Sequence, residues 1–196
     1  GIIDPGVDIK KYPVCYASHA TADAVKEIMV ADGLQARDIV SLTCTVPPVV
    51  ASNLTYHSPR TAAEAQFSLH FAIASIVLHG DITLKHLTTK VLSSAPIKRL
   101  MAGIIVKVGD IPQQHRSSKS ICPEWGYVEL NTQSGSHKSC FVGSPVGSAS
   151  RPLSDKILKK KFNDCVQYKN SNSSEFTLYE KILNIDLLQN AQDLFS

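Results

Sequence analysis

The residues best able to do chemistry are concentrated in one stretch near the N-terminus, from Lys10 to Asp23. Two adjacent cations, Lys10 and Lys11, are followed by the thiol of Cys15 and the imidazole of His19. Ammonium groups bind carboxylates and phosphates, and an imidazole changes its charge near neutral pH. This combination favours a site for a small anion.

A helix that begins at this stretch would strengthen such a site. Ser18 is a good N-cap residue, because its hydroxyl can accept a hydrogen bond from a free amide of the first turn. The run from Ala20 to Val30 carries apolar residues at helical spacing, which predicts a helix and places His19 at its first position. Unpaired amides and the positive end of the helix dipole attract anions. The alternative is a lysine-flanked connector with a capped helix that binds nothing.

The second candidate anion contact is Arg60. It precedes a capping box in which Thr61 and Glu64 each bond the other's backbone amide. The spacing of apolar residues predicts one helix from there to about His79, with a stop at Gly80. An arginine just before a helix is unfavourably placed at the positive end of the dipole unless an anion binds there. An exposed arginine without a ligand is the alternative.

The rest of the pattern predicts an α+β fold with a small mixed or antiparallel sheet and two or three helices. Alternating or continuous apolar runs, bounded by Pro and Gly, mark the strands. Asp81 to Ser93 is typical of a short helical region, and Ile111 to Pro123 of a long surface loop. The expected strands are Asp38–Val46, Gly103–Val108, Glu124–Thr132 and Lys138–Val142.

A connector rich in Ser, Gly and Pro, Gly143–Pro152, divides the chain. It predicts an α+β domain at 1–142, a linker at 143–153 and a C-terminal helical segment at 154–196. A run of lysines at 159–161 in the last part is more typical of a solvated helix face than of a nucleic-acid site.

The composition argues against several classes of protein. The net charge of +3 is too small for a typical nucleic-acid-binding domain, and no apolar run is long enough to span a bilayer. The five cysteines are scattered without CxxC or Cys/His spacing, so neither a disulfide framework nor a zinc site is indicated. No secretory signal pattern opens the sequence, so we expect a cytoplasmic protein. Motifs of phosphate-binding loops, zinc proteases and serine hydrolases are absent.

Three segments of the chain carry a recognisable pattern: Lys10-Lys11-Tyr12-Pro13-Val14-Cys15 with His19 and Asp23, Pro59 to Leu69 with Gly80, and Gly143-Ser144-Pro145 with Arg151-Pro152-Leu153-Ser154. In this order, they resemble the MmgE/PrpD family, which includes 2-methylcitrate dehydratase, cis-aconitate decarboxylase and iminodisuccinate epimerase. The resemblance implies a small α+β lid domain followed by the last helices of an all-helical domain. It also implies an N-terminal helical domain as a partner, a homodimer, and no metal or nucleotide cofactor.

The resemblance assigns roles to the residues of these segments. Lys10 would bind or polarise a substrate carboxylate, and His19 would line the cleft as a donor or proton carrier. Arg60 would be a weaker second anion contact, with Cys15 and Ser18 in the wall of the substrate site. Such groups suit a reaction that builds negative charge next to a carboxylate.

Phe71 departs from the family pattern, because relatives often have a tyrosine here that lines the active site. Phenylalanine keeps the ring and loses the hydroxyl, so a hydrogen bond or proton delivery from this position is gone. The resemblance thus predicts a cofactor-free lyase or isomerase for small di- or tricarboxylates, first of all 2-methylcitrate dehydration. Decarboxylation of cis-aconitate and epimerisation are alternatives within the family. A catalytically inert lid domain or an interaction module is the alternative outside enzymes.

Overall fold

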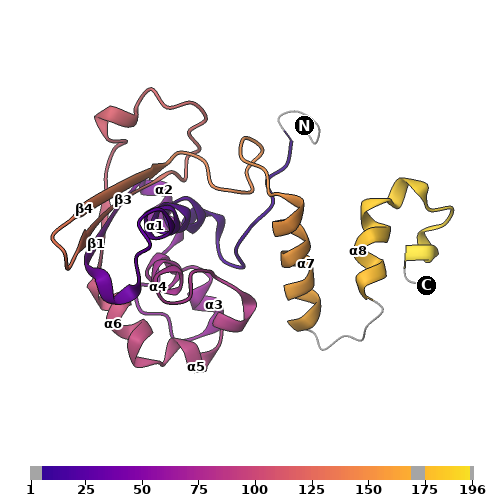
Figure 1. Ribbon diagram of the computed structural model, residues 1–196, viewed down its shortest axis with the longest axis horizontal. Coiled ribbons are helices and arrows are strands. Elements are labelled where there is room, and N and C mark those ends of the chain that lie inside the picture. The colour runs from indigo at the N-terminus through magenta and orange to yellow at the C-terminus, as the bar shows by residue number, and fades with distance from the viewer. Residues whose placement is uncertain (1–5, 169–174, 195–196) are drawn as a thin grey trace. The chain divides into compact units, whose positions relative to one another are not determined.

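The computed structural model describes residues 6–168 and 175–194. The chain divides into two compact units, Gly1–Leu153 and Ser154–Ser196 (Figure 1). The first unit contains a sheet and several helices, and the described part of the second contains helices only. Each unit is described by itself below.

The first unit is built on a four-stranded mixed sheet in the order β2-β1-β3-β4. β1 pairs in parallel with β2, whereas β1–β3 and β3–β4 are antiparallel. The predicted α+β class and mixed sheet are confirmed, and the four strands lie where the sequence placed them. The strands are β1 (Ile39–Val46), β2 (Ile104–Val108), β3 (Gly126–Thr132) and β4 (His137–Val142), and the helices are α1 (His19–Ala31), α2 (Pro48–Asn53), α3 (Ala62–Ala65), α4 (Leu69–His79), α5 (Thr89–Leu92) and α6 (Ala95–Gly103).

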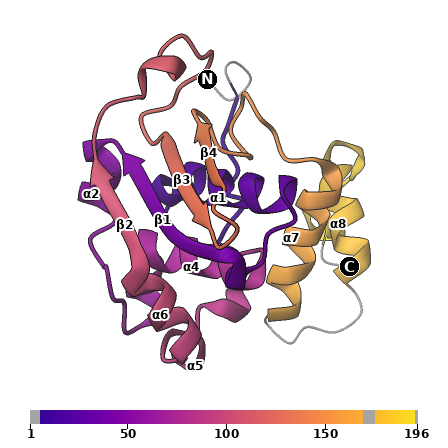
Figure 2. The ribbon, with the colours of Figure 1, turned by 60° about the vertical axis from the view of Figure 1, so that its left-hand side comes forward.

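The core lies between one face of the sheet and the helices. In β1, Leu42, Cys44 and Val46 point inward and are buried, while the alternate residues between them are half-buried. α1 packs on β3 and β4, and α4 packs beside α1 and α6. Figure 2 shows α1 and α4 behind the strands, on one side of the sheet. α1 therefore lies at the centre of the unit, between the sheet and α4.

Gly126, at the start of β3, brings the sheet unusually close to the first turns of α1. A Cβ atom at this position would come within 2.7 Å of the backbone nitrogen of Thr21. Such a contact is too short for any side chain, so only glycine allows this approach. The N-terminal end of α1 is consequently fixed against the sheet.

The single helix expected from Thr61 to His79 is instead two helices, α3 and α4. Ser68 separates them: its hydroxyl accepts a hydrogen bond from the Phe71 amide at 3.1 Å and begins α4. α4 ends at Gly80, whose φ of +68° is left-handed, as predicted. The sequence prediction missed the break because Ser68 lies within an unbroken pattern of apolar residues.

The capping box at the start of α3 is confirmed in only one of its two bonds. The Thr61 hydroxyl accepts from the Glu64 amide at 3.2 Å, as expected. The Glu64 carboxylate, however, accepts from the amide of Arg60 at 2.6 Å and not from that of Thr61. The reciprocal bond is thus made one residue earlier than predicted.

The second unit contains α7 (Asp155–Tyr168), α8 (Glu175–Leu183) and two 3-10 helices, Ile185–Leu187 and Ala191–Leu194. Tyr179 of α8 is buried, and its ring lies 5.2 Å from that of Phe162 on α7. Lys159 and Glu180 join the same two helices by an ion pair at 2.9 Å. Within the described residues, no helix has the length and apolar character needed to cross a membrane.

Candidate active-site segment

The candidate stretch folds as a bent segment that leads into α1 through a 3-10 helix, Tyr16–Ser18. Ser18 precedes α1 as predicted, but it makes no side-chain cap. Its backbone is already helical, and its hydroxyl donates to the Cys15 carbonyl at 2.8 Å. A side-chain cap requires an extended backbone at this position, and the preceding 3-10 turn prevents it. The predicted capping bond is therefore wrong.

The two neighbouring lysines have different environments. The Lys11 ammonium lies 2.8 Å from a carboxylate oxygen of Asp23, and its side chain is only 13% exposed. Lys10 is exposed, and among the described residues it has no hydrogen-bond or ion-pair partner. Lys10 is therefore the one of the two that is free to meet a ligand.

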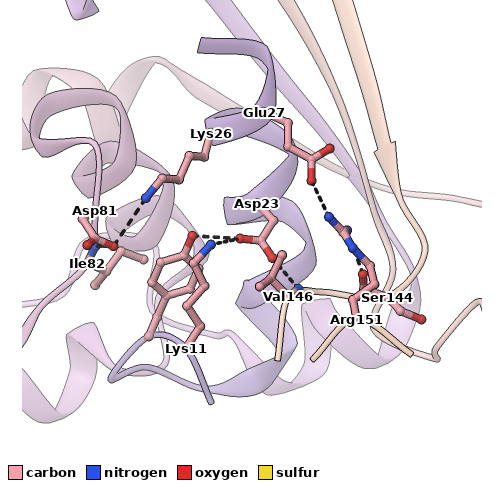
Figure 3. Close-up of polar contacts among 10 residues, drawn as sticks. Lys11, Asp23, Lys26, Glu27, Asp81, Ile82, Ser144, Val146 and Arg151 are labelled. Atoms are coloured by element: carbon pink, nitrogen blue, oxygen red, sulfur yellow. Dashed lines mark hydrogen bonds and ion pairs between the residues drawn. The ribbon is translucent and has the colours of Figure 1, made fainter. Parts of the chain in front are cut away.

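Asp23 joins three segments of the first unit. Its Oδ1 atom accepts from the Lys11 ammonium and from the Tyr12 hydroxyl, each at 2.8 Å. Its Oδ2 atom accepts from the backbone amide of Val146 at 2.7 Å. Figure 3 shows this carboxylate on α1 between Lys11 and Val146. Burial and the Asp23 carboxylate both raise the pKa of Tyr12, so the phenol keeps its proton and donates.

His19 is fully enclosed, with 0% exposure. Its ring lies 5.1 Å from that of Tyr12 in an edge-on arrangement and 5.2 Å from that of Tyr16. Neither ring nitrogen has a hydrogen-bond partner among the described residues. Burial lowers the pKa of His19 to about 4, although the Val14 carbonyl and Asp23 favour the charged ring. The imidazole is therefore neutral at physiological pH.

The other predicted site residues are dispersed. The Cys15 amide donates to the Gln66 carbonyl at 2.8 Å, which places the candidate segment beside the chain between α3 and α4. Phe71 belongs to the same region, but it is 0% exposed and forms part of the core. Arg60 is exposed, and its guanidinium has no partner among the described residues. No contact found within the described residues joins Arg60 or Phe71 to Lys10.

A family comparison decides what kind of domain carries this segment. The model of the MmgE/PrpD C-terminal domain matches residues 12–185. The chain belongs to the MmgE/PrpD family. The match covers most of both units and includes Cys15, His19, Arg60 and Phe71, and it begins directly after Lys10 and Lys11. A comparison with curated protein sequences gave no significant match.

This MmgE/PrpD domain has a second pair of side chains that the sequence did not indicate. The rings of His57 and His70 lie 4.8 Å apart, near the start of α4. His70 is buried, and its Nδ1 atom has no partner among the described residues. Burial and the nearby His57 lower the pKa of His70. The two histidines are separated by a loop and a short helix and share no motif, so the sequence alone does not indicate their contact.

The described residues offer no metal site. Across 6–168 and 175–194, no three His, Cys, Asp or Glu side chains are grouped so that they could hold an ion. The five cysteines are all free thiols in this structure. Burial raises the pKa of the Cys44 thiol, and burial with the nearby Glu27 raises that of Cys140 to about 12. Both therefore remain protonated and are weak metal ligands at neutral pH.

Proposed function

We propose that this chain is part of a cofactor-free lyase or isomerase that acts on small di- or tricarboxylates. The reaction moves a proton on the carbon next to a carboxylate, most simply in the dehydration of 2-methylcitrate. Membership in the MmgE/PrpD family supports the class of enzyme. The observation that carries the site assignment is that Lys10 is exposed and has no partner among the described residues, directly beside a paired Lys11.

Lys10 would act on the carboxylate adjacent to the reacting carbon. Removal of a proton there builds negative charge on the carboxylate oxygens, so a fixed cation stabilises the transition state more than the ground state. A single donor in such a position is typically worth about 10²–10³ in turnover. No carboxylate of the candidate segment competes for Lys10, because Asp23 already accepts from Lys11, Tyr12 and Val146.

His19 would be a neutral donor or proton carrier at the inner end of the same segment. A neutral imidazole donates with one nitrogen and accepts with the other, and neither nitrogen is committed within the described residues. The ring is fully enclosed and lies against Tyr12 and the half-buried Tyr16, so a substrate would reach it only after its cover moves. Lys10 therefore meets the substrate first.

The remaining predicted residues have smaller proposed roles. Arg60 would be a second and weaker anion contact, reached from solvent. Cys15 and Ser18 would form part of the wall behind Lys10. Phe71, which is enclosed in the core, would support that wall from beneath and supply no proton.

A helical partner domain, joined in a cytoplasmic homodimer, would supply the catalytic base. The second unit supports this part of the proposal, because it exposes several large apolar side chains. Leu187 is 74% exposed, and Leu183 and Ile185 are more than half exposed. Exposed apolar surface of this kind is typical of an interface with another domain or subunit.

The test is an assay of the 196-residue chain, and of a protein that carries it together with the helical domain, for 2-methylcitrate dehydration and cis-aconitate decarboxylation. We expect turnover only when the helical domain is present. Turnover by the chain alone would contradict the claim that another domain supplies essential groups. No turnover on any di- or tricarboxylate in the complete protein would favour an inert domain or an interaction module.

A further inference from the structure

We propose that Asp23 is a positioning residue for Lys10. By holding Lys11 and Tyr12 inward, it turns Lys10, and not its neighbour, toward the carboxylate of a substrate. The inference rests on the proposed function, because it assumes that Lys10 meets a carboxylate. The Asp23 carboxylate would thus select which of two chemically identical side chains, Lys10 or Lys11, is free for the substrate.

The selection follows from competition for one buried carboxylate. Lys10 and Lys11 are the same residue type at adjacent positions, and either ammonium could pair with Asp23 if the segment shifted by one residue. A lysine bound to Asp23 is no longer available to a substrate. Whichever residue Asp23 holds therefore decides which residue is free.

Two hydrogen bonds from consecutive residues to the same carboxylate oxygen oppose such a shift. Oδ1 of Asp23 accepts from Lys11 and from the hydroxyl of Tyr12. A shift that brought Lys10 to the carboxylate would remove the Tyr12 hydroxyl, and that hydroxyl is buried and would be left without an acceptor. The Lys11 ammonium also lies 4.7 Å from the centre of the Tyr12 ring, which further couples the two residues.

The carboxylate itself is held on a rigid support. Asp23 lies on α1, whose first turns pack against β3 at Gly126. Its second oxygen accepts from Val146, so it is also fixed to the chain that follows β4. The ring of Tyr12 extends the effect inward, since it packs edge-on against His19. A single carboxylate thus orients both proposed active-site residues.

Glu27 provides a matched control one turn further along α1. It pairs with Arg151 at 2.8 Å, and Arg151 in turn donates to the carbonyl of Ser144. Glu27 therefore also connects α1 to the chain after β4, as Figure 3 shows, but it makes no bond to Lys11 or Tyr12. If Asp23→Asn acted only by loosening the link between α1 and the chain after β4, Glu27→Gln would change the lysine reactivities in the same way.

The experiment measures how fast an amine-reactive reagent modifies each lysine of the 196-residue chain, resolved by peptide mass spectrometry. In the unsubstituted protein we expect Lys10 to react at least about 10-fold faster than Lys11, which is charge-paired and mostly buried. Asp23→Asn should raise the Lys11 rate about 10-fold and remove the preference. Glu27→Gln should leave the ratio unchanged. A slow Lys11 in Asp23→Asn, or the same change in Glu27→Gln, would overturn the proposal.

Two additions keep the test decisive. If Asp23→Asn does not fold, Tyr12→Phe removes one of the two bonds to Oδ1 and should raise the Lys11 rate about 3-fold. In the protein that also carries the helical domain, citrate, a tricarboxylate, should slow modification of Lys10, and in Asp23→Asn this protection should be lost or spread to Lys11. Protection that persists unchanged in Asp23→Asn would contradict the positioning role. No protection at all, with the expected labelling ratios, would contradict the proposed function and leave the contact of Asp23 with Lys11 established.

Discussion

The candidate residues fall into two regions that are stabilised in different ways. The segment from Lys10 to His19 is organised by long-range polar contacts with Asp23, and one cation remains exposed at its outer end. The segment from Arg60 to Phe71 is organised by local caps at Thr61 and Ser68, with one end in solvent and the other in the core. The contacts of the first segment fix side chains relative to one another, whereas the caps of the second segment fix only its backbone.

This difference indicates where a site can form. A reacting group must be positioned to within a fraction of an ångström, which requires neighbours that restrain its side chain. Asp23, Tyr12 and Lys11 supply such restraint on the first segment. Around Arg60 the only described polar contact is made by its backbone, so its side chain is free to move. The two regions should therefore respond differently to substitution.

The largest effect is expected from Lys11→Met, which breaks the ion pair in the first region. It leaves the buried Asp23 without its cation, and loss of one partner of a buried pair costs about 3–5 kcal/mol. The free energy of unfolding in urea measures this cost. Lys138→Met is the control, because its pair with Asp32 is partly exposed at 2.6 Å and should contribute under about 1 kcal/mol. Equal losses in both variants would show that the two ion pairs do not differ.

The pH dependence of stability sharpens the same contrast. The pKa of His19 is lowered from 6.5 to about 4 in the folded protein, and that of His70 is also lowered. The unfolded chain binds protons that the folded one does not, so stability should fall as pH drops from about 6.5 toward about 4. One pKa unit corresponds to about 1.4 kcal/mol, so the total loss is a few kcal/mol. The free energy of unfolding, measured in urea at a series of pH values, should depend less on pH in His19→Phe than in the unsubstituted protein. An unchanged pH dependence would contradict the neutral, buried ring.

A smaller effect is expected in the second region from Phe71→Tyr. The position is fully enclosed, so the new hydroxyl enters the core without an assured partner. An unsatisfied buried hydroxyl costs about 1–3 kcal/mol, and thermal unfolding should show the loss. Ser58→Ala is a control for substitution at an exposed position. A stable Phe71→Tyr protein with higher turnover would instead indicate that this position opens into the active site.

The smallest effect is expected from Arg60→Ala. Arg60 is exposed and unpaired among the described residues, so stability should change by less than about 0.5 kcal/mol. As a mobile contact it should contribute to binding and little to turnover, with KM raised a few-fold and kcat unchanged. Steady-state kinetics of the complete protein measure both constants. A large loss of kcat would show that Arg60 is positioned by a neighbour outside this chain.

The sequence predicted the fold well where one periodicity ran without interruption. The four strands and the apolar face of α4 belong to this class. The prediction failed where a single polar residue decided the outcome. At Ser68 the hydroxyl caps the start of α4, inside a stretch that the sequence predicts as one helix. The prediction also missed α6. Pro96 suits the first turn of a helix, and Ile97 and Met101, which the structure buries, are apolar residues at helical spacing.

The sequence indicated candidate site residues but not the contacts that they make. Residue types and the family pattern indicated Lys10 and His19 as a pair. They could not show that Lys11 is held by Asp23, or that His19 is enclosed by two tyrosine rings, because these contacts depend on tertiary packing. The pairing of His57 with His70 was unpredictable for the same reason.

The central claim is that Lys10 contacts the substrate carboxylate, and kinetics of Lys10→Ala and Lys10→Arg in the complete protein test it most directly. We expect kcat/KM on 2-methylcitrate to fall about 10²–10³-fold in Lys10→Ala with little change in the free energy of unfolding. Lys10→Arg, which keeps the charge but changes its geometry, should retain part of the activity. Kinetics of Lys10→Ala that match those of the unsubstituted protein would contradict the account.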